Sequence, residues 1–501
     1  MRLRRVLALA ATAAVAVSLI GVPSQAQERT PAQDPGVRTD ASSRVAARAL
    51  VQAREVLWGD RRGDATLALR ELRRHRDELS AGDRASADLL LARPTTGRTT
   101  CFTTVCVHWS ATGAGRSTAD YVQQVADTAE HVLETYAAAG YRGPEADGTR
   151  GGNGLLDIYL QDLGSQGLYG YCDSDREPPT DGPYDTWAYC AFDNDYAEFP
   201  SHTPLENLQV TAAHELFHAV QFAYDYYEDA WFMEATATWA EDELYDDVDD
   251  NLQYLPTSPL AQPRKAMDHF SSTGLRQYGD WIFFRYLTEH LTERAGGLPT
   301  FVRDVWELAD GAKNGPDDYS IAAVDHALAA RGENLRETWA AFAAANRRPR
   351  AAYDEGRANR YPSARPGVSV ELSGSHRDTG WTTRRVDHLA SITYRLTRAP
   401  RMAASRLRLR LDLPATARGS GAVVTIYREA GRTVTVPLRL SGSGDATRKV
   451  AFGRGVTRVE VTLANAGIDY KCWRQQDTGY SCRGRSEDDD LPMRLRATAV
   501  R

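Results

Sequence analysis

Residues 203–222 read TPLENLQVTAAHELFHAVQF and predict a helix that is apolar on most of its faces. Thr203 is placed to cap the first turn, Pro204 suits the first helical position, and Glu206 completes a capping box. No glycine and no other proline interrupts the stretch. Because apolar residues occur on several sides, we expect this helix to lie in the core of a domain.

The same helix carries His214-Glu215-Leu216-Phe217-His218, an HExxH pattern. Residues four positions apart share one face of a helix, so His214 and His218 can hold one metal ion together. Glu215 is then placed to act as a catalytic general base on water at that metal. Unpaired polar groups are costly inside a buried helix, and a metal would supply the partners. We therefore expect a Zn²⁺ site here.

A third ligand is expected, because catalytic zinc usually takes three protein ligands and leaves one position open. Glu234 lies in the apolar, helix-compatible run WFMEATATWAE, residues 231–241. A carboxylate among such neighbours is expected to be buried and partnered, by a metal or by a structural hydrogen bond. Glu241 lies two turns further along the same face. We expect Glu234 as the third metal ligand and keep Glu241 open as the alternative.

Two segments together resemble a family of secreted bacterial zinc metalloproteases of the gluzincin type. They are TAAHELFHAVQ, residues 211–221, and WFMEATATW, residues 231–239. The likeness extends over about residues 107–291 and includes YGDWIF, residues 278–283. It implies an α+β, zincin-like core of two subdomains: a mixed sheet with the active-site helix, then a helical subdomain.

The resemblance also implies roles for single residues. It gives His214, His218 and Glu234 as zinc ligands and Glu215 as the base. Tyr278 belongs to the shared YGDWIF segment and could donate a hydrogen bond to a developing oxyanion, or be a core tyrosine.

The N-terminus predicts export. A basic start, an apolar run at residues 6–22 and small residues at 24–26 are typical of a signal peptide covering residues 1–26. We expect a secreted, extracellular protein that makes no membrane contact after cleavage. The six cysteines of an exported chain are expected to form disulfides. Their local spacing favours the pairs Cys101–Cys106, Cys172–Cys190 and Cys472–Cys482.

Residues 27–98 precede the expected catalytic domain. Residues 27–40 are rich in Pro, Gln and Asp and are expected to be disordered, whereas residues 41–91 show helical periodicity. The segment is either a removable inhibitory propeptide, which would make the chain a zymogen, or a helical part of the mature fold.

The expected catalytic domain covers residues 99–350. We expect strands near residues 103–109, 155–160, 168–171 and 186–192, and a helix over 118–139. Residues 187–192 are the candidate strand that would hold an extended peptide substrate by backbone pairing. Residues 230–350 are expected to be helical.

Residues 351–366 resemble a linker, after which the hydrophobic period changes to two. RLRLRLDL, residues 406–413, alternates throughout, and several short strands with Gly/Ser turns follow. Residues 367–501 therefore predict a C-terminal β-sandwich domain.

Composition restricts the possible partners. The chain has 501 residues and a net charge of −7, and it has no concentrated basic patch beyond its N-terminal region, so we expect no nucleic-acid partner. Neither a G-x-S-x-G elbow nor a phosphate loop occurs. The acidic residues 246–251 and Asp193-Asn194-Asp195 could bind Ca²⁺, although a solvated acidic loop is the favoured reading of the first.

These observations predict a secreted zinc-dependent endopeptidase that acts on a protein or peptide. One alternative is a secreted zinc-containing binding or adhesion protein that acts through the C-terminal β domain. Another is a zinc amidase that acts on cell-wall peptides and shares the same site. Glu215 beside the two histidines argues against a purely structural zinc, because a closed site needs no base.

Overall fold

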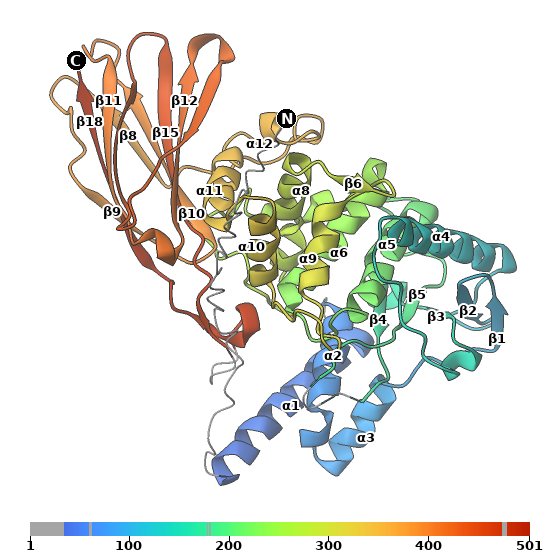
Figure 1. Ribbon diagram of the computed structural model, residues 1–501. Coiled ribbons are helices and arrows are strands. Elements are labelled where there is room, and N and C mark those ends of the chain that lie inside the picture. Colours follow the sequence, from blue (N-terminus) through green and yellow to red (C-terminus); the bar gives the residue numbers. More distant parts are fainter. Residues whose placement is uncertain (1–34, 60–62, 178, 180–181, 473–477) are drawn as a thin grey trace, which may run out of the picture.

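The computed structural model describes residues 35–59, 63–177, 179, 182–472 and 478–501 (Figure 1). The signal peptide expected at residues 1–26 lies outside these residues. The architecture is α+β: N-terminal helices, a body of one sheet with many helices, and a C-terminal unit of strands. None of the helices in these ranges has the length and apolar character that crossing a membrane requires.

The N-terminal part forms α1 (Pro35–Trp58), α2 (Ala65–His75) and α3 (Ala81–Leu90), as the periodicity predicted. The start of α1 at Pro35 corrects part of the disorder expected for residues 27–40. Proline fits the first turn of a helix, where its missing N–H would have no partner in any case. Asp64 caps α2 by accepting a hydrogen bond from the Leu67 N–H.

The body contains a five-stranded sheet in the order β1-β2-β3-β5-β4. Strands β2, β3 and β5 are parallel, whereas β1 and β4 pair antiparallel at the two edges. The expectation that residues 187–192 hold a substrate is therefore wrong: β5 has partners on both sides, and β4 is the edge strand. The bounds are β1 Arg98–Cys101, β2 Val105–Trp109, β3 Leu156–Gln161, β4 Gly170–Asp173 and β5 Tyr189–Asp193.

Both faces of the sheet are covered. Helices α4 (Ala119–Ala138) and α5 (Pro204–Phe222) share a core with Ile158 and its face of the sheet. The N-terminal helices pack on the opposite face, which presents Tyr159. Successive residues of a strand point to opposite faces, so this division follows directly from the pleat. The predicted capping box of α5 is confirmed, with both of its hydrogen bonds present.

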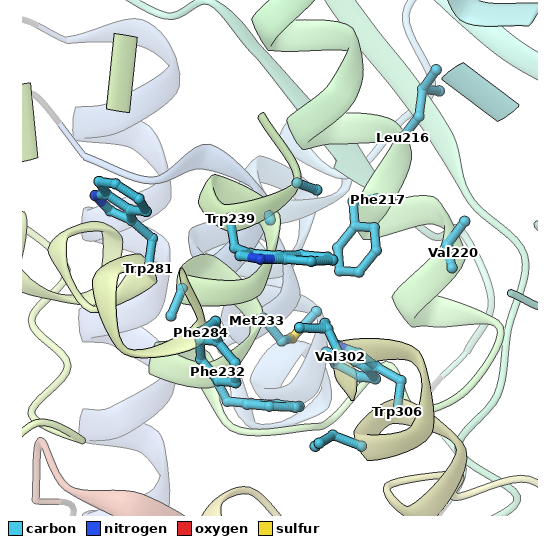
Figure 2. Packing of buried hydrophobic residues seen from close by; sticks show 14 of the residues in the cluster. Leu216, Phe217, Val220, Phe232, Met233, Trp239, Trp281, Phe284, Val302 and Trp306 are labelled. Carbon is cyan, nitrogen blue, oxygen red and sulfur yellow. The ribbon is translucent and has the colours of Figure 1, made fainter. Parts of the chain in front are cut away.

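The helical half follows α5. Figure 2 shows Phe217 of α5 beside Trp239 of α6, with ring centroids 6.4 Å apart. This packing fixes α6 against α5. The helices are α6 (Ala230–Leu244), α7 (Arg276–Gly279), α8 (Trp281–His290), α9 (Thr300–Leu308), α10 (Ile321–Ala330), α11 (Leu335–Ala345) and α12 (Pro349–Ala352), with a short hairpin of β6 (Arg294–Ala295) and β7 (Leu298–Pro299) before α9.

The segment expected as a linker is packed rather than free. Tyr353 and Tyr361 are buried there, and the Tyr353 hydroxyl donates a hydrogen bond to Asn346 over 2.6 Å. Because these two aromatic rings pack into the core, residues 351–366 belong to the folded body and are not a free linker.

The C-terminal unit contains two large sheets packed around a core of their own, in the orders β13-β12-β15-β10-β8 and β14-β11-β18-β9, and a separate two-stranded sheet of β16 and β17 (Figure 1). The predicted alternation along residues 406–413 is confirmed, because alternate residues of β11 are buried. The bounds are β8 Val368–Leu372, β9 Thr382–Val386, β10 Ala390–Arg398, β11 Arg406–Asp412, β12 Ser420–Arg428, β13 Thr433–Pro437, β14 Asp445–Ala451, β15 Val456–Asn465, β16 Tyr470–Lys471, β17 Arg485–Ser486 and β18 Leu491–Val500.

Three disulfides confirm the predicted cysteine pairs: Cys101–Cys106, Cys172–Cys190 and Cys472–Cys482. The second joins β4 directly to β5 and so ties the edge strand to the sheet.

Candidate metal centre

The structure brings together three side chains that the sequence singled out. His214 and His218 lie one turn apart on α5, and Glu234 comes from the facing helix α6. The two Nε2 atoms are 3.1 Å apart, and Glu234 Oε2 lies 3.2 Å from His214 Nε2. Glu234 Oε1 lies 3.3 Å from His218 Nε2.

These separations fit a tetrahedral ion. Zinc binds nitrogen and oxygen ligands at roughly 2.1 Å, and the edges of such a tetrahedron are then roughly 3.4 Å long. The distances within the cluster, 3.1–3.3 Å, are close to that edge length. Glu234 is fully buried, and its Oε1 accepts no hydrogen bond from the described part of the chain. A cation held by all three side chains would satisfy this oxygen.

Each histidine is oriented by a hydrogen bond at its Nδ1 atom, on the side of the ring away from the cluster. His214 Nδ1 lies 2.5 Å from Glu241 Oε1, and His218 Nδ1 lies 2.7 Å from Gln221 Oε1. Because each Nδ1–H donates to an oxygen, each Nε2 keeps its lone pair for the cluster. Glu234 therefore faces the Nε2 atoms, whereas Glu241 supports His214 from its other side. Gln221 is a functional candidate that the sequence reasoning missed, although its position three residues after His218 could have indicated it.

The negative charge of Glu234 shifts the pKa values of the groups in the cluster. Burial works against the charged form of Glu234, but His218 and His214 hold the pKa of its carboxyl well below its usual range. Burial likewise opposes charged imidazoles, but Glu234 raises the pKa of both histidines, and Glu241 adds to the effect at His214. Positive charge is thus strongly favoured next to Glu234, and a divalent ion would supply it.

Glu215 lies beside the edge strand. It is buried, and burial raises the pKa of its carboxyl, with the two histidines acting in the opposite direction. Gly170, the first residue of β4, lets this side chain approach: a Cβ there would lie 3.0 Å from Glu215 Cγ and 2.9 Å from Thr211 Cγ2. The candidate base therefore reaches the strand at which an extended chain could pair.

Tyr278 also lies at the cluster. Its ring is 6.0 Å from the His214 ring and stacks on Tyr254 at 4.9 Å. Its hydroxyl donates a hydrogen bond to Asp64 Oδ2 over 2.9 Å. Asp64 was not among the residues singled out from the sequence, because it lies in the N-terminal segment, far from the HExxH helix in the chain.

Asp64 carries a strongly shifted carboxyl. Burial raises its pKa to about 8, and the negative charge of Glu234 acts in the same direction. His218 acts on Asp64 as an opposing positive charge. The Asp64 carboxyl is therefore an electrostatic neighbour of the histidine and glutamate cluster.

The acidic residues considered for calcium have other partners. Asp193 accepts hydrogen bonds from four backbone N–H groups, those of Leu163, Gly164, Asp195 and Tyr196, although carboxylate oxygens of Asp195 and Glu198 lie within 4.8 Å of its own. In the 246–251 region, Asp246 clusters with Asp242 and Glu355 around the guanidinium of Arg285.

No family model matches this chain, and no curated protein matches it. The pre-peptidase C-terminal domain of a collagenase from Bacillus anthracis is similar to part of it, with 7% identity, a TM-score of 0.17 and coverage of 27% of this chain and 95% of that one. A periplasmic inhibitor of g-type lysozyme from Aeromonas hydrophila, PliG, shows 10% identity, a TM-score of 0.15 and coverage of 26% and 96%. Likenesses of this size carry no argument about function, so the function is argued from the geometry of the site.

Proposed function

We propose that this protein is a secreted zinc-dependent endopeptidase with a zincin-like core of the gluzincin type. One observation supports the proposal: a buried glutamate, Glu215, follows His214 on α5 and approaches the edge strand β4 at Gly170, while His214, His218 and Glu234 lie close enough together to hold a metal ion. A structural zinc site would need neither a base nor an open strand beside it.

His214, His218 and Glu234 would hold the Zn²⁺. The ion would make a water molecule acidic enough to lose its proton near pH 7 and would polarise the substrate carbonyl. Every other step falls to side chains of this protein.

Glu215 would accept the proton of the attacking water and pass it to the leaving amine. Burial raises the pKa of this carboxyl, which makes it a stronger base than an exposed glutamate. An extended peptide would pair with β4 through the Cys172 N–H. The Tyr278 hydroxyl, once free of Asp64, would donate a hydrogen bond to the oxygen of the tetrahedral intermediate.

The test compares Glu215→Gln with wild type for zinc content and for hydrolysis of casein. Each protein is tested as the full chain and after cleavage at a protease site inserted after Ala92, an exposed residue just beyond the N-terminal helices. We expect zinc in both proteins and about 10²–10⁴-fold slower hydrolysis in the variant. Glu134→Gln, an exposed change on α4, is the matched control and should hydrolyse at the wild-type rate.

Two results would contradict the proposal. Hydrolysis by Glu215→Gln at the wild-type rate would remove the base from the mechanism. One zinc per chain with no hydrolysis by either form of the wild type would favour a binding protein that acts through its C-terminal β domain.

A further inference from the structure

A cleft lies where the helical body meets the C-terminal β unit. Its volume is about 790 Å³, within the range of pockets that hold small ligands. Three parts of the chain line it: the loop of residues 261–265, the connection at residues 365–367, and the end of β9. These parts contain none of the residues of the candidate metal centre, so the cleft is a separate feature of the molecule.

The lining of the cleft is strongly basic. Four exposed basic residues line it, and one acidic residue does: Arg264, Lys265, Arg365 and Arg385, with Asp387. Four positive charges and one negative charge leave a net charge of +3 here, although the whole chain carries −7. Because a concave surface of one charge sign concentrates counter-ions, the cleft should attract anions.

Most of this positive charge has no partner. Within the described part of the chain, the side chains of Arg264, Lys265 and Arg365 form neither a hydrogen bond nor an ion pair. Arg385 donates to the carbonyl oxygen and the carboxylate of Asp490 over 2.9 and 3.1 Å. Both of these side chains are more than half exposed, and exposed pairs contribute little stability, so Arg385 can turn towards a ligand at small cost.

The loop of residues 261–265 is held in place from inside the molecule. The buried guanidinium of Arg276 donates a hydrogen bond to the Lys265 carbonyl oxygen over 2.8 Å. The N–H of Ser391, on β10, donates to the Pro263 carbonyl oxygen over 2.7 Å. The backbone of this wall is therefore fixed before a ligand arrives, which lowers the entropic cost of binding.

The connection at residues 365–367 is attached to the same strand. The Gly367 N–H donates to the Thr393 carbonyl oxygen of β10 over 2.9 Å. A Cβ added at Gly367 would lie 2.6 Å from Ile392 Cγ1 and 4.0 Å from Arg264 Cδ. The absence of a side chain thus allows a close approach to β10 and brings the stem of Arg264 beside the connection. Both walls of the cleft are positioned by β10.

The surroundings of Lys265 also favour an anion. Partial burial and the positive charge of Arg276 lower the pKa of the Lys265 ammonium group, with Asp280 acting in the opposite direction. A negative group in the cleft would stabilise the charged form of this lysine.

The chemistry of the basic side chains favours phosphate groups. A guanidinium presents its N–H donors in a planar fork that matches two oxygens of a phosphate or a carboxylate. A phosphate offers three acceptor oxygens, so one group can bind a guanidinium and an ammonium group together, whereas a carboxylate offers two. Four cations spread over three parts of the chain require more than one such group.

We propose that this cleft binds a small molecule that carries two or more phosphate groups, held by Arg264, Lys265, Arg365 and Arg385. The ligand would contact the body through residues 261–265 and the C-terminal unit through β9, so it would join the two. Because the cleft is separate from the metal centre, binding can be measured without any hydrolysis and in the full chain.

The first test titrates the full chain with fructose 1,6-bisphosphate by calorimetry at physiological ionic strength. We expect one site with a dissociation constant below about 1 mM. Fructose 6-phosphate, which lacks one phosphate, should bind about tenfold more weakly, because a hydrogen bond to a charged group contributes about that factor. Absence of binding by the bisphosphate would overturn the proposal. Tricarballylate, which carries three carboxylates, should bind more weakly than the bisphosphate, and equal affinity would overturn the assignment to phosphate.

Variants on two walls of the cleft locate the site. Arg264→Gln and Arg365→Gln should each weaken binding of the bisphosphate about tenfold. Arg439→Gln changes an exposed arginine of the C-terminal unit outside the cleft, so this matched control should bind as wild type does. All three side chains are exposed, so the variants should fold, which urea unfolding checks.

Two results with the variants would contradict the proposal. Wild-type affinity in both Arg264→Gln and Arg365→Gln would place the ligand elsewhere. Equal weakening in these variants and in Arg439→Gln would show that the bisphosphate responds to the total charge of the chain and not to the cleft.

Discussion

Gln221 provides the sharpest quantitative test of how the metal centre is supported. It is fully buried, and its Oε1 accepts the Nδ1–H of His218 over 2.7 Å. Its Nε2 donates to the Met233 carbonyl and the Thr236 hydroxyl of α6, each over 3.0 Å. One amide thus orients a proposed ligand on α5 and joins that helix to the helix that carries Glu234.

The change Gln221→Leu would remove both functions while keeping a side chain of similar size. Loss of a partner that orients a histidine ligand typically lowers metal affinity 10–100-fold, or about 1.4–2.8 kcal/mol. The change also leaves the His218 Nδ1–H without its partner, whereas the Met233 carbonyl still accepts the Thr236 hydroxyl over 3.2 Å. One unsatisfied buried group costs roughly 1–3 kcal/mol, so the free energy of unfolding should fall by about 1–3 kcal/mol.

Zinc affinity would be measured by competition with a fluorescent chelator, and stability by urea unfolding with the zinc removed. The two experiments separate the loss of metal affinity from the loss of folding energy. Gln123→Leu, an exposed glutamine on α4, serves as the control and should change neither quantity. A folded Gln221→Leu protein with zinc affinity within threefold of wild type would show that Gln221 does not orient His218 for metal binding.

Three further predictions concern the rest of the fold, each checked by urea unfolding. Thr203→Ala removes the N-cap of α5 and should lower the free energy of unfolding by about 1 kcal/mol, with zinc content unchanged. Burial opposes a charged His388, but Asp268 and Asp489 raise its pKa from 6.5 to about 10. Because the folded pKa is the higher one, this stabilisation is complete below pH 6.5 and is lost as the pH rises to about 10, a decline that His388→Gln should lack. Arg347→Ala removes the 2.8 Å partner of buried Glu460, which keeps Arg395 and Arg458 at 3.1 and 3.2 Å, so the free energy of unfolding should fall by about 1.5–3 kcal/mol.

Local patterns in the sequence predicted the helix that carries the site. The capping box begins α5 at Pro204, and the spacing of four places His214 and His218 on one face whatever the rest of the fold does. The disulfides were also local, since each pair is separated by at most 18 residues. Such features depend only on residues that are close together in the chain, so they can be predicted from the sequence alone.

The remaining features depend on how distant segments pack. Glu234 and Glu241 share a face of α6, so only the packing of α6 on α5 separates the residue that faces the Nε2 atoms from the one behind His214. Strand order is likewise a tertiary property, and it makes β4 rather than β5 the edge. Asp64 lies 170 residues before Glu234, so no local pattern indicated that its carboxyl would lie near the cluster.

The proposed function depends on one zinc ion bound by His214, His218 and Glu234 together. Its most direct test is the metal content of wild type and His218→Ala after equilibration with Zn²⁺ and removal of the unbound metal, with zinc K-edge absorption reporting the ligands. We expect one zinc per wild-type chain with two imidazole ligands, and loss of most of that zinc in the variant. Wild type without zinc, or a variant that retains one zinc per chain in an unchanged ligand environment, would contradict it.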